Sequence, residues 1–475
     1  MIRPVVPVLA LFLSVIAIPV CSAPPPPGEG STIASDTTWS GEVLLRQNVV
    51  VSPGATLRVL PGTKVRVEGG RKLGITVLGR LRVEGTASEP VSFLPENNPS
   101  VRGQWEGIRL SGGRGTSHDL NGFRLAGARD GISLVETTAK LSGGTLSACD
   151  TGIRASQKSV VVSDNCAFDG NGDGVFLSFG GEGAFRGCRF TEIRGNGIVV
   201  DKGALLKVSG STFARGKTGI DSLTNSPCRV EGCSFLSLEK GISARQMGKD
   251  SSVDRCSFEN NGAGILAVQN CTVEVRDSVF LGNRTAVDVQ EFSSPAIRNS
   301  RFERNQVAVN VLRKSRPAVE RNLFTHNRTA VVVNYSSYPK ISGNNFDRND
   351  MSVRLEQFQS GDWEERVGSR QVTGSELNRR GPRTPGTEEA LRGYPVSRRI
   401  DAKGNYWGPD PERDPAKGTH GKIRDGRKFG PVRYEGSGDA EFAIDVVDAA
   451  DEAHAPLPGA GPRPDSPGKT PPEAR

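Results

Sequence analysis

A large apolar residue recurs every 22 or 23 residues through the middle of this chain. It is phenylalanine in all but one of the repeats, and the series is Phe123, Leu146, Phe168, Phe190, Phe213, Phe235, Phe258, Phe280, Phe302, Phe324 and Phe346. Self-similarity at such a period is typical of a solenoid, in which each repeat forms one coil and its neighbours bury its apolar face. The period therefore constrains the architecture before any chemistry is considered.

The pattern around each member of this series predicts short strands. In residues 295–355 three repeats align without a gap, and apolar residues alternate over only two or three positions on either side of the phenylalanine. Such short alternation is typical of strands of about three to five residues, and no stretch has the longer apolar period of a helix. Three strands with their corners fill one coil, and coils stack about 4.8 Å apart. We predict an all-β fold, a single-stranded right-handed parallel β-helix.

An asparagine follows three residues after the phenylalanine in five successive coils. These residues are Asn261, Asn283, Asn305, Asn327 and Asn349. Stacked amides can hydrogen-bond to one another and to backbone groups that would otherwise be buried without partners. Asparagine also tolerates the left-handed backbone conformation that a tight corner demands. We expect these side chains to form a structural ladder.

Four cysteines share one position of the repeat, two residues before the phenylalanine, where strand alternation points them inward. Cys166 and Cys188 fall on adjacent coils, as do Cys233 and Cys256. Stacking would bring their Cα atoms to about 4.8 Å, which is within disulfide range. The same column could equally consist of buried thiols that pack as small apolar groups. We expect mainly free thiols.

The C-terminal part of the chain carries the clearest family resemblance. Residues 404–408 read GNYWG, after a stretch in which the repeat period has stopped. Over residues 31–435 the chain resembles the pectin-lyase-like superfamily of right-handed β-helices. The GNYWG run resembles the closing motif of exported bacterial β-helix proteins, including the family of the nitrous-oxide-reductase maturation factor. This resemblance implies that Tyr406 and Trp407 cap the last coil, whereas a superfamily of lyases, hydrolases, epimerases, adhesins and binding proteins implies no single activity.

The remaining segments are assigned from composition. Residues 1–22 resemble a secretory signal peptide, and we divide the rest into a Pro-rich tether (23–30), N-terminal capping coils (31–110), regular repeats (111–355), an Arg/Gly-rich excursion (356–402), a closing segment (403–436) and a disordered tail (437–475). We expect export to the periplasm, the outer surface or the medium, with no transmembrane segment once the signal is removed. A lipid anchor at Cys21 is a less favoured alternative, because Val20 stands where a lipobox has a small residue.

The distribution of charge indicates an acidic partner. The formal net charge is +8, and residues 366–433 alone hold 16 Lys and Arg against 8 Asp and Glu. Such a region favours an anionic polysaccharide or another component of the cell envelope. No nucleic-acid-binding motif is present, so we expect no nucleic-acid partner. The candidate contacts are four arginines and four aromatic residues in exposed register: Arg379, Arg380, Arg398, Arg399, Phe176, Phe179, Tyr335 and Tyr338.

The sequence offers no evident catalytic or metal-binding set. The outward position after each inward aliphatic residue holds only two aspartates, Asp221 and Asp288, which fall three coils or about 14 Å apart. Glycoside hydrolysis needs two carboxylates that are closer together. The four histidines are scattered, so we expect no metal, no cofactor and no catalytic residue.

We favour a non-catalytic exported scaffold that binds polysaccharide or another envelope component. Residues 146–346 contain no long loop that would wall a cleft, as enzymes of this fold require. One alternative is a lyase, hydrolase or epimerase that acts on an acidic glycan. The other is a periplasmic metal-handling module.

Overall fold

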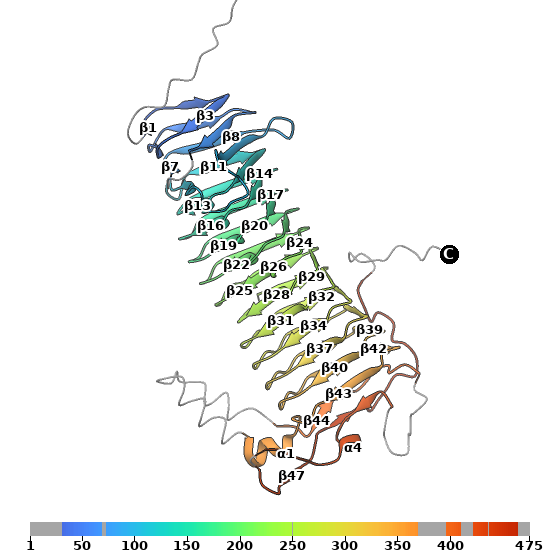
Figure 1. Cartoon of the computed structure of the whole chain (residues 1–475). Helices are drawn as coiled ribbons and strands as arrows, with labels where there is room; N and C mark the ends of the chain where they lie inside the picture. The colour runs from blue at the N-terminus through green and yellow to red at the C-terminus, as the bar shows by residue number, and fades with distance from the viewer. Residues whose placement is uncertain are drawn as a thin grey trace, which may run out of the picture.

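The computed structural model describes residues 31–68, 73–248, 250–368, 396–409, 421–435 and 437–463. They form an elongated parallel β-helix, in which the strands stack along one axis (Figure 1). Three sheets run the length of the molecule, with 16 strands in sheet A, 16 in sheet B and 14 in sheet C. Each coil adds one strand to each sheet in turn, as the 22-residue period predicts. The proposed signal peptide, the tether and Cys21 lie outside the described residues.

Sheet A consists of β1 (Ser31–Ile33), β4 (Val49–Val51), β7 (Gly74–Val77), β10 (Gly107–Leu110), β13 (Asp130–Val135), β16 (Thr151–Ser156), β19 (Asp173–Leu177), β22 (Asn196–Val200), β25 (Thr218–Ser222), β28 (Lys240–Arg245), β31 (Ala263–Val268), β34 (Thr285–Val289), β37 (Val307–Val311), β40 (Thr329–Val333), β43 (Met351–Leu355) and β45 (Ile423–Arg424). Sheet B consists of β2 (Thr37–Trp39), β5 (Thr56–Val59), β8 (Arg80–Glu84), β11 (Ser117–Asn121), β14 (Thr138–Ser142), β17 (Val160–Asp164), β20 (Glu182–Arg186), β23 (Leu205–Ser209), β26 (Cys228–Glu231), β29 (Ser252–Asp254), β32 (Glu274–Arg276), β35 (Ala296–Arg298), β38 (Ala318–Glu320), β41 (Lys340–Ser342), β44 (Arg399–Asp401) and β48 (Val446–Asp448). Sheet C consists of β3 (Glu42–Leu45), β6 (Lys64–Val67), β9 (Val91–Pro95), β12 (Phe123–Ala126), β15 (Thr145–Ser147), β18 (Ala167–Asp169), β21 (Arg189–Thr191), β24 (Thr212–Ala214), β27 (Ser234–Leu236), β30 (Ser257–Glu259), β33 (Val279–Leu281), β36 (Arg301–Glu303), β39 (Leu323–Thr325) and β42 (Asn345–Asp347).

A continuous column of aromatic rings fills the interior beside sheet C. From Phe168 to Phe346 each ring stacks on the ring of the next coil, with centroids 4.5 to 4.9 Å apart and planes within 13° of parallel. These distances match the rung spacing of a parallel sheet, so the backbone hydrogen bonds and the ring contacts impose the same period. The rings are almost fully buried. The apolar series is therefore the core of the fold.

The first member of the series, Phe123, was assigned to the wrong position. In the register of sheet C, Leu125 pairs with Leu146 on one side and with Phe93 on the other. Phe123 lies two positions earlier, in the slot that cysteines occupy in later coils. The neighbouring coil has Gly144 in that slot, where a Cβ atom would come within 2.3 Å of the Phe123 ring. A phenylalanine fits there only because the next coil has no side chain.

Two hydrogen-bonded ladders line the corners next to this column. In the first, the side-chain oxygen of each asparagine from Asn283 to Asn349 accepts from the backbone and side-chain nitrogens of the asparagine one coil earlier, and the ladder comprises Asn261, Asn283, Asn305, Asn327 and Asn349. Each side-chain nitrogen also donates to a backbone carbonyl, as from Asn305 to Phe280. In the second ladder Asn322, Asn344 and Asn405 bond in the same way. Buried corner groups are thereby satisfied from coil to coil.

The GNYWG run forms a further rung at the C-terminal end of the column. Asn405 continues the second asparagine ladder, and Tyr406 bridges Asn345 in parallel at the end of sheet C. The Trp407 ring stacks on Phe346 at 4.7 Å and is almost fully buried. Tyr406 itself is only half-buried. Trp407 therefore covers the last phenylalanine, while the backbone of Tyr406 supplies the hydrogen bonds.

Two segment boundaries from the sequence analysis are wrong. The expected excursion (356–402) contains β44, which extends sheet B, and begins with α1 (Gly361–Trp363) and the π-helix η1 (Glu364–Gly368). The expected disordered tail (437–475) contains β48, which pairs with β44, and buries Ile444 and Val447. A strand needs few apolar residues when an existing sheet edge supplies its hydrogen bonds, so the polar composition of these segments does not exclude strands.

The last two turns of the chain are interrupted between sheets A and B. One insertion separates β43 from β44, and the other separates β45 from β48. The second insertion holds α4 (Gly426–Phe429) and an antiparallel pair, β46 (Val432–Arg433) with β47 (Glu441–Phe442). Figure 1 shows α1, α4 and β47 gathered at the C-terminal end of the solenoid. None of the helices in the described part of the chain has the length and apolar character to cross a membrane.

All seven cysteines of the described residues are free and buried: Cys149, Cys166, Cys188, Cys228, Cys233, Cys256 and Cys271. The expectation of free thiols is thus met for both stacked pairs. Burial raises the pKa of Cys149 and of Cys228 to about 12, because an apolar interior disfavours the thiolate. These thiols act as small core side chains.

We predict that removing one ring from the column destabilises the solenoid markedly. Phe258→Ala leaves a cavity between Phe235 and Phe280, and the free energy of unfolding should fall by about 3–5 kcal/mol. Urea denaturation followed by circular dichroism measures this. Phe179→Ala, at a ring that is 55% exposed, is the control and should change stability by less than about 0.5 kcal/mol. Equal effects of the two variants would refute the role of the column.

We also predict that these seven thiols resist alkylation in the native protein. Iodoacetamide should leave them unmodified without denaturant and modify all of them in guanidinium chloride, since reaction needs an exposed thiolate. Peptide mass spectrometry assigns each site. Rapid native labelling of Cys149 or Cys228 would contradict the buried placement.

Candidate functional site

The corners between sheets A and B form an unusual outer edge of the solenoid. Successive coils place two adjacent residues in the left-handed region there, for example Glu291 and Phe292 (φ 55° and 61°) or Tyr335 and Ser336 (φ 52° and 53°). Backbone bonds such as that from Phe292 N to Arg313 O (3.0 Å) connect one corner to the next. Most of these side chains, such as those of Phe292 and Tyr335, are exposed, whereas Ser336 is buried. Core packing therefore does not select the exposed ones, although a left-handed backbone disfavours β-branched residues.

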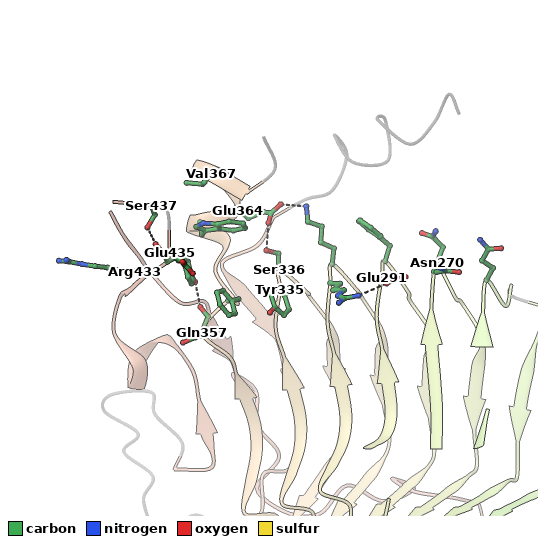
Figure 2. Close-up of a pocket in the computed structure, with 18 residues that line it drawn as sticks. Asn270, Glu291, Tyr335, Ser336, Gln357, Glu364, Val367, Arg433, Glu435 and Ser437 are labelled. Carbon is green, nitrogen blue, oxygen red and sulfur yellow. Dashed lines mark hydrogen bonds and ion pairs between the residues drawn. The ribbon is translucent and has the colours of Figure 1, made fainter. Parts of the chain in front are cut away.

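A groove runs along this edge at the C-terminal end of the solenoid. It encloses about 1100 Å³. Its floor consists of the A–B corners of six successive coils, and its far wall consists of the two C-terminal insertions (Figure 2). The floor residues are Gln246, Gln269, Asn270, Glu291, Phe292, Arg313, Lys314, Tyr335, Ser336, Gln357 and Phe358, and the wall residues are Trp363, Glu364, Val367, Arg433, Tyr434, Glu435 and Ser437. The two C-terminal insertions therefore form one wall of a groove in this protein, although the regular repeats contain no such insertion.

Aromatic rings continue from coil to coil along this outer edge. Tyr335 stacks on Phe358 at 5.2 Å, and Phe358 stacks on Tyr434 at 5.3 Å. Trp363 meets Tyr434 edge-on at 5.8 Å. Unlike the inner column, Tyr335 and Phe358 are open to solvent, at 46% and 37% exposure, whereas Trp363 and Tyr434 are half-buried. Phe292, two coils before Tyr335, is 41% exposed. Exposed rings that line one groove are typical of a binding surface.

Ion pairs organise the polar part of the groove. Arg313 pairs with Glu291 at 3.0 Å within the floor. Glu364, which is almost fully buried, joins the wall to the floor because it pairs with Lys314 at 2.5 Å and accepts from Ser336 at 2.9 Å. In Figure 2 Glu364 lies directly above Ser336. The wall is therefore held in place by a charged contact across the groove.

A buried carboxylate anchors the wall from behind. Asp445 accepts from the backbone nitrogen of Gly361 at 2.7 Å and from the side chain of Gln359 at 2.9 Å. Burial raises the pKa of Asp445 to about 6, although these hydrogen bonds and the nearby Arg398 act in the opposite direction. The hydroxyl of Tyr434 donates to the backbone oxygen of Gln357, and burial raises the pKa of Tyr434 to about 12. Both contacts connect the insertions to the last coils.

Only one of the aromatic candidates from the sequence, Tyr335, lies in the groove. Phe179 belongs to the same A–B edge several coils toward the N-terminus, and its ring faces Lys202 at 4.3 Å. Phe176 lies on the outer face of sheet A with the Arg154 guanidinium 5.0 Å from its ring. Tyr338 is half-buried and packs against the core.

The arginine candidates do not form one basic surface in the described residues. Arg398 pairs with Glu365 at 2.7 Å and with Asp362 at 3.3 Å, and these contacts raise its pKa. Arg399 is an exposed residue of β44. Arg379 and Arg380 lie outside the described residues.

Sequence reasoning missed most of the residues that line the groove. Phe292, Lys314 and Phe358 follow the last inward residue of a sheet A strand by three residues, so the column repeats at the coil period. An aligned reading of that column would have found them. Trp363, Glu364 and Tyr434 carry no such signal, because only the tertiary structure brings the insertions over this edge.

Comparison with protein families gives two matches. The model of the periplasmic copper-binding protein family (NosD) matches residues 182–412, and that of the right-handed β-helix region matches residues 97–235. The chain is thus a right-handed parallel β-helix repeat protein. No curated protein matches it.

Several solved structures are similar at low identity. The PL6 family polysaccharide lyase from Pseudopedobacter saltans is 8% identical, covers 79% of this chain and 96% of its own, and has a TM-score of 0.33. The periplasmic alginate epimerase AlgG is 9% identical, covers 66% and 74%, and has a TM-score of 0.29. The alginate lyase from Paenibacillus sp. str. FPU-7 is 14% identical, covers 62% and 91%, and has a TM-score of 0.23. None of these likenesses bears on the activity of this chain.

The described residues do not fit a copper site. Nowhere among them do three or more His, Cys, Asp or Glu side chains gather in a group that could hold a metal ion. The ring of His118 is buried, with one nitrogen 3.2 Å from the backbone nitrogen of Leu81 and the other 3.1 Å from Thr137 Oγ1. Burial lowers the pKa of His118 to about 4. Copper prefers clustered imidazole and thiolate ligands, whereas the thiols here lie in the core. His420 lies outside the described residues.

We predict that Asp445 favours the folded state increasingly as the pH falls from 7 toward 5, while the buried His118, with a pKa of about 4, acts in the opposite direction over the same range. The pKa of Asp445 is about 6 in the folded chain, against an ordinary value of 3.8 for an aspartate that is open to solvent. Folding therefore favours the protonated acid. The cost of charging it, about 3 kcal/mol, is present above pH 6 and is relieved between pH 6 and pH 4. Calorimetric melting between pH 4.5 and pH 8 measures the slope. The wild type should gain stability relative to Asp445→Asn as the pH falls, and parallel slopes in the two proteins would contradict the assignment.

Proposed function

We propose that this protein is a non-catalytic, exported scaffold and that its groove binds a polysaccharide chain. The row of rings formed by Tyr335, Phe358 and Tyr434, of which the first two are exposed and the third is half-buried, carries this proposal. Because these rings stack on one another, they present their edges along the groove, and the apolar faces of successive sugar rings can pack against those edges. The charged and amide side chains between them offer hydrogen-bond partners. The match to a periplasmic family and the signal-like residues 1–22 support export.

A binding role suits the groove better than glycoside hydrolysis. Hydrolysis requires one carboxylic acid that is protonated and a second carboxylate at a defined separation from it. The floor and wall carboxylates Glu291 and Glu364 each face a cation, Arg313 and Lys314 respectively. Both carboxylates therefore support the architecture of the groove, and the third carboxylate of the groove, Glu435, lies exposed on the wall.

Loss of one exposed ring should weaken binding without loss of stability. We expect Tyr335→Ala to reduce affinity for a bound polysaccharide by about tenfold, which corresponds to about 1.4 kcal/mol. Affinity electrophoresis in gels that contain soluble polysaccharides provides the measurement.

Phe179→Ala is the matched control, because Phe179 is similarly exposed on the same edge but does not line the groove. It should migrate as the wild type. Equal retardation of the wild type and Tyr335→Ala would refute the groove as the binding site, and release of oligosaccharides by the wild type would refute the non-catalytic role.

A further inference from the structure

We infer that the groove selects neutral polysaccharides and not the anionic polymers that the net charge of the chain favours. This inference rests on the proposed function of the groove and names its ligand class. It depends on how the charged residues of the groove are partnered, on the uncharged groups between them, and on the spacing of the coils.

The charges that line the groove are balanced in number, and each of its cations has a carboxylate partner. The three cations are Arg313, Lys314 and Arg433, and the three carboxylates are Glu291, Glu364 and Glu435. Arg313 and Lys314 pair within the groove at 3.0 and 2.5 Å. Arg433 pairs with Glu441 at 3.2 Å on the adjoining strand.

An anionic ligand would have to compete with a protein carboxylate for each of these cations. Breaking the largely buried Lys314–Glu364 pair is costly, since it leaves one charge without its partner. The pairs of Arg313 and Arg433 are exposed and individually weaker, but they reduce the positive charge that a ligand meets in the groove. Two further arginines among the described residues of 366–433 are also paired: Arg366 with Asp362, and Arg398 with Asp362 and Glu365.

The remaining polar side chains of the groove are amides and hydroxyls. They are Gln246, Gln269, Asn270, Ser336, Gln357 and Ser437. Such groups include both donors and acceptors, as sugar hydroxyls do. Together with the exposed rings of Phe292, Tyr335 and Phe358 they match an uncharged pyranose, which has apolar C–H faces and a hydroxylated rim.

The spacing of the coils indicates how the ligand lies. The groove floor spans six successive A–B corners, from Gln246 to Phe358, and neighbouring corners are about 4.8 Å apart. The floor is therefore about 24 Å long, and an extended polysaccharide parallel to the axis meets about one sugar per coil. We expect affinity to rise with oligosaccharide length up to about six residues.

The test compares neutral and anionic polymers on the full chain. Isothermal titration calorimetry with a soluble mixed-linkage β-glucan, a galactomannan, polygalacturonate and alginate, at low and high salt, separates the possibilities. We expect at least one neutral polymer to bind at least tenfold more tightly than either anionic polymer, with an affinity that salt does not change. Preferential, salt-sensitive binding of polygalacturonate or alginate would overturn the inference and leave the proposed function standing. Binding of none of the four would overturn both.

A charge variant tests the physical reason. Glu291→Gln removes the partner of Arg313 and should increase affinity for polygalacturonate by about tenfold, or about 1.4 kcal/mol. Glu192→Gln is the matched control, because it breaks an equivalent exposed pair with Arg215 (2.6 Å) at a corner outside the groove, and it should change nothing. No gain for Glu291→Gln, or an equal gain for both variants, would overturn the inference.

Discussion

The parallel stacking of coils is the constraint on which every other feature of this protein depends. Backbone hydrogen bonds set one repeat distance for all three sheets, and any side chain in a column must tolerate an identical neighbour at that distance. Flat aromatic rings meet this condition, as the 4.5–4.9 Å separations from Phe168 to Phe346 show. Asparagines meet it in another way, because each amide accepts from the coil before it and donates onward. The interior is therefore a set of columns and not a mixture of contacts.

The corners along the outer edge between sheets A and B have the same spacing as the inner columns. Their side chains, however, are not restricted to those that pack in the core. Most side chains of this edge point to solvent, so amide, charged and aromatic side chains follow one another there without harm to the core. The chain uses this freedom where two insertions return over the edge and create a walled groove. Glu364 and Asp445 hold that wall, one from within the groove and the other from behind it. The stacked coils thus set the spacing of the residues on the groove floor, and the insertions form the wall of the groove.

The groove changes the interpretation of the net charge. A chain with a formal charge of +8 invites an acidic partner, yet the cations at its groove are occupied by carboxylates of the same molecule. Net charge governs long-range attraction, whereas selection in the groove depends on whether each charge already has a partner. The local pairing therefore carries more weight for the choice of ligand than the total.

The sequence by itself determined the fold class, the coil period, the inward phenylalanines and the asparagine ladder. The reason is that the same packing and hydrogen-bonding requirements recur in every coil. It also located Tyr335, whose column repeats at the same period. Only the tertiary structure decided that β44 and β48 extend sheet B, that Phe123 takes the slot opposite Gly144, and that Trp363, Glu364 and Tyr434 meet the edge of the coils. Those residues occur once, outside any period, and their neighbours are set by where the insertions return. A repeat can be recognised in the amino-acid sequence, whereas a wall formed by insertions that return over the coils can be recognised only in the tertiary structure.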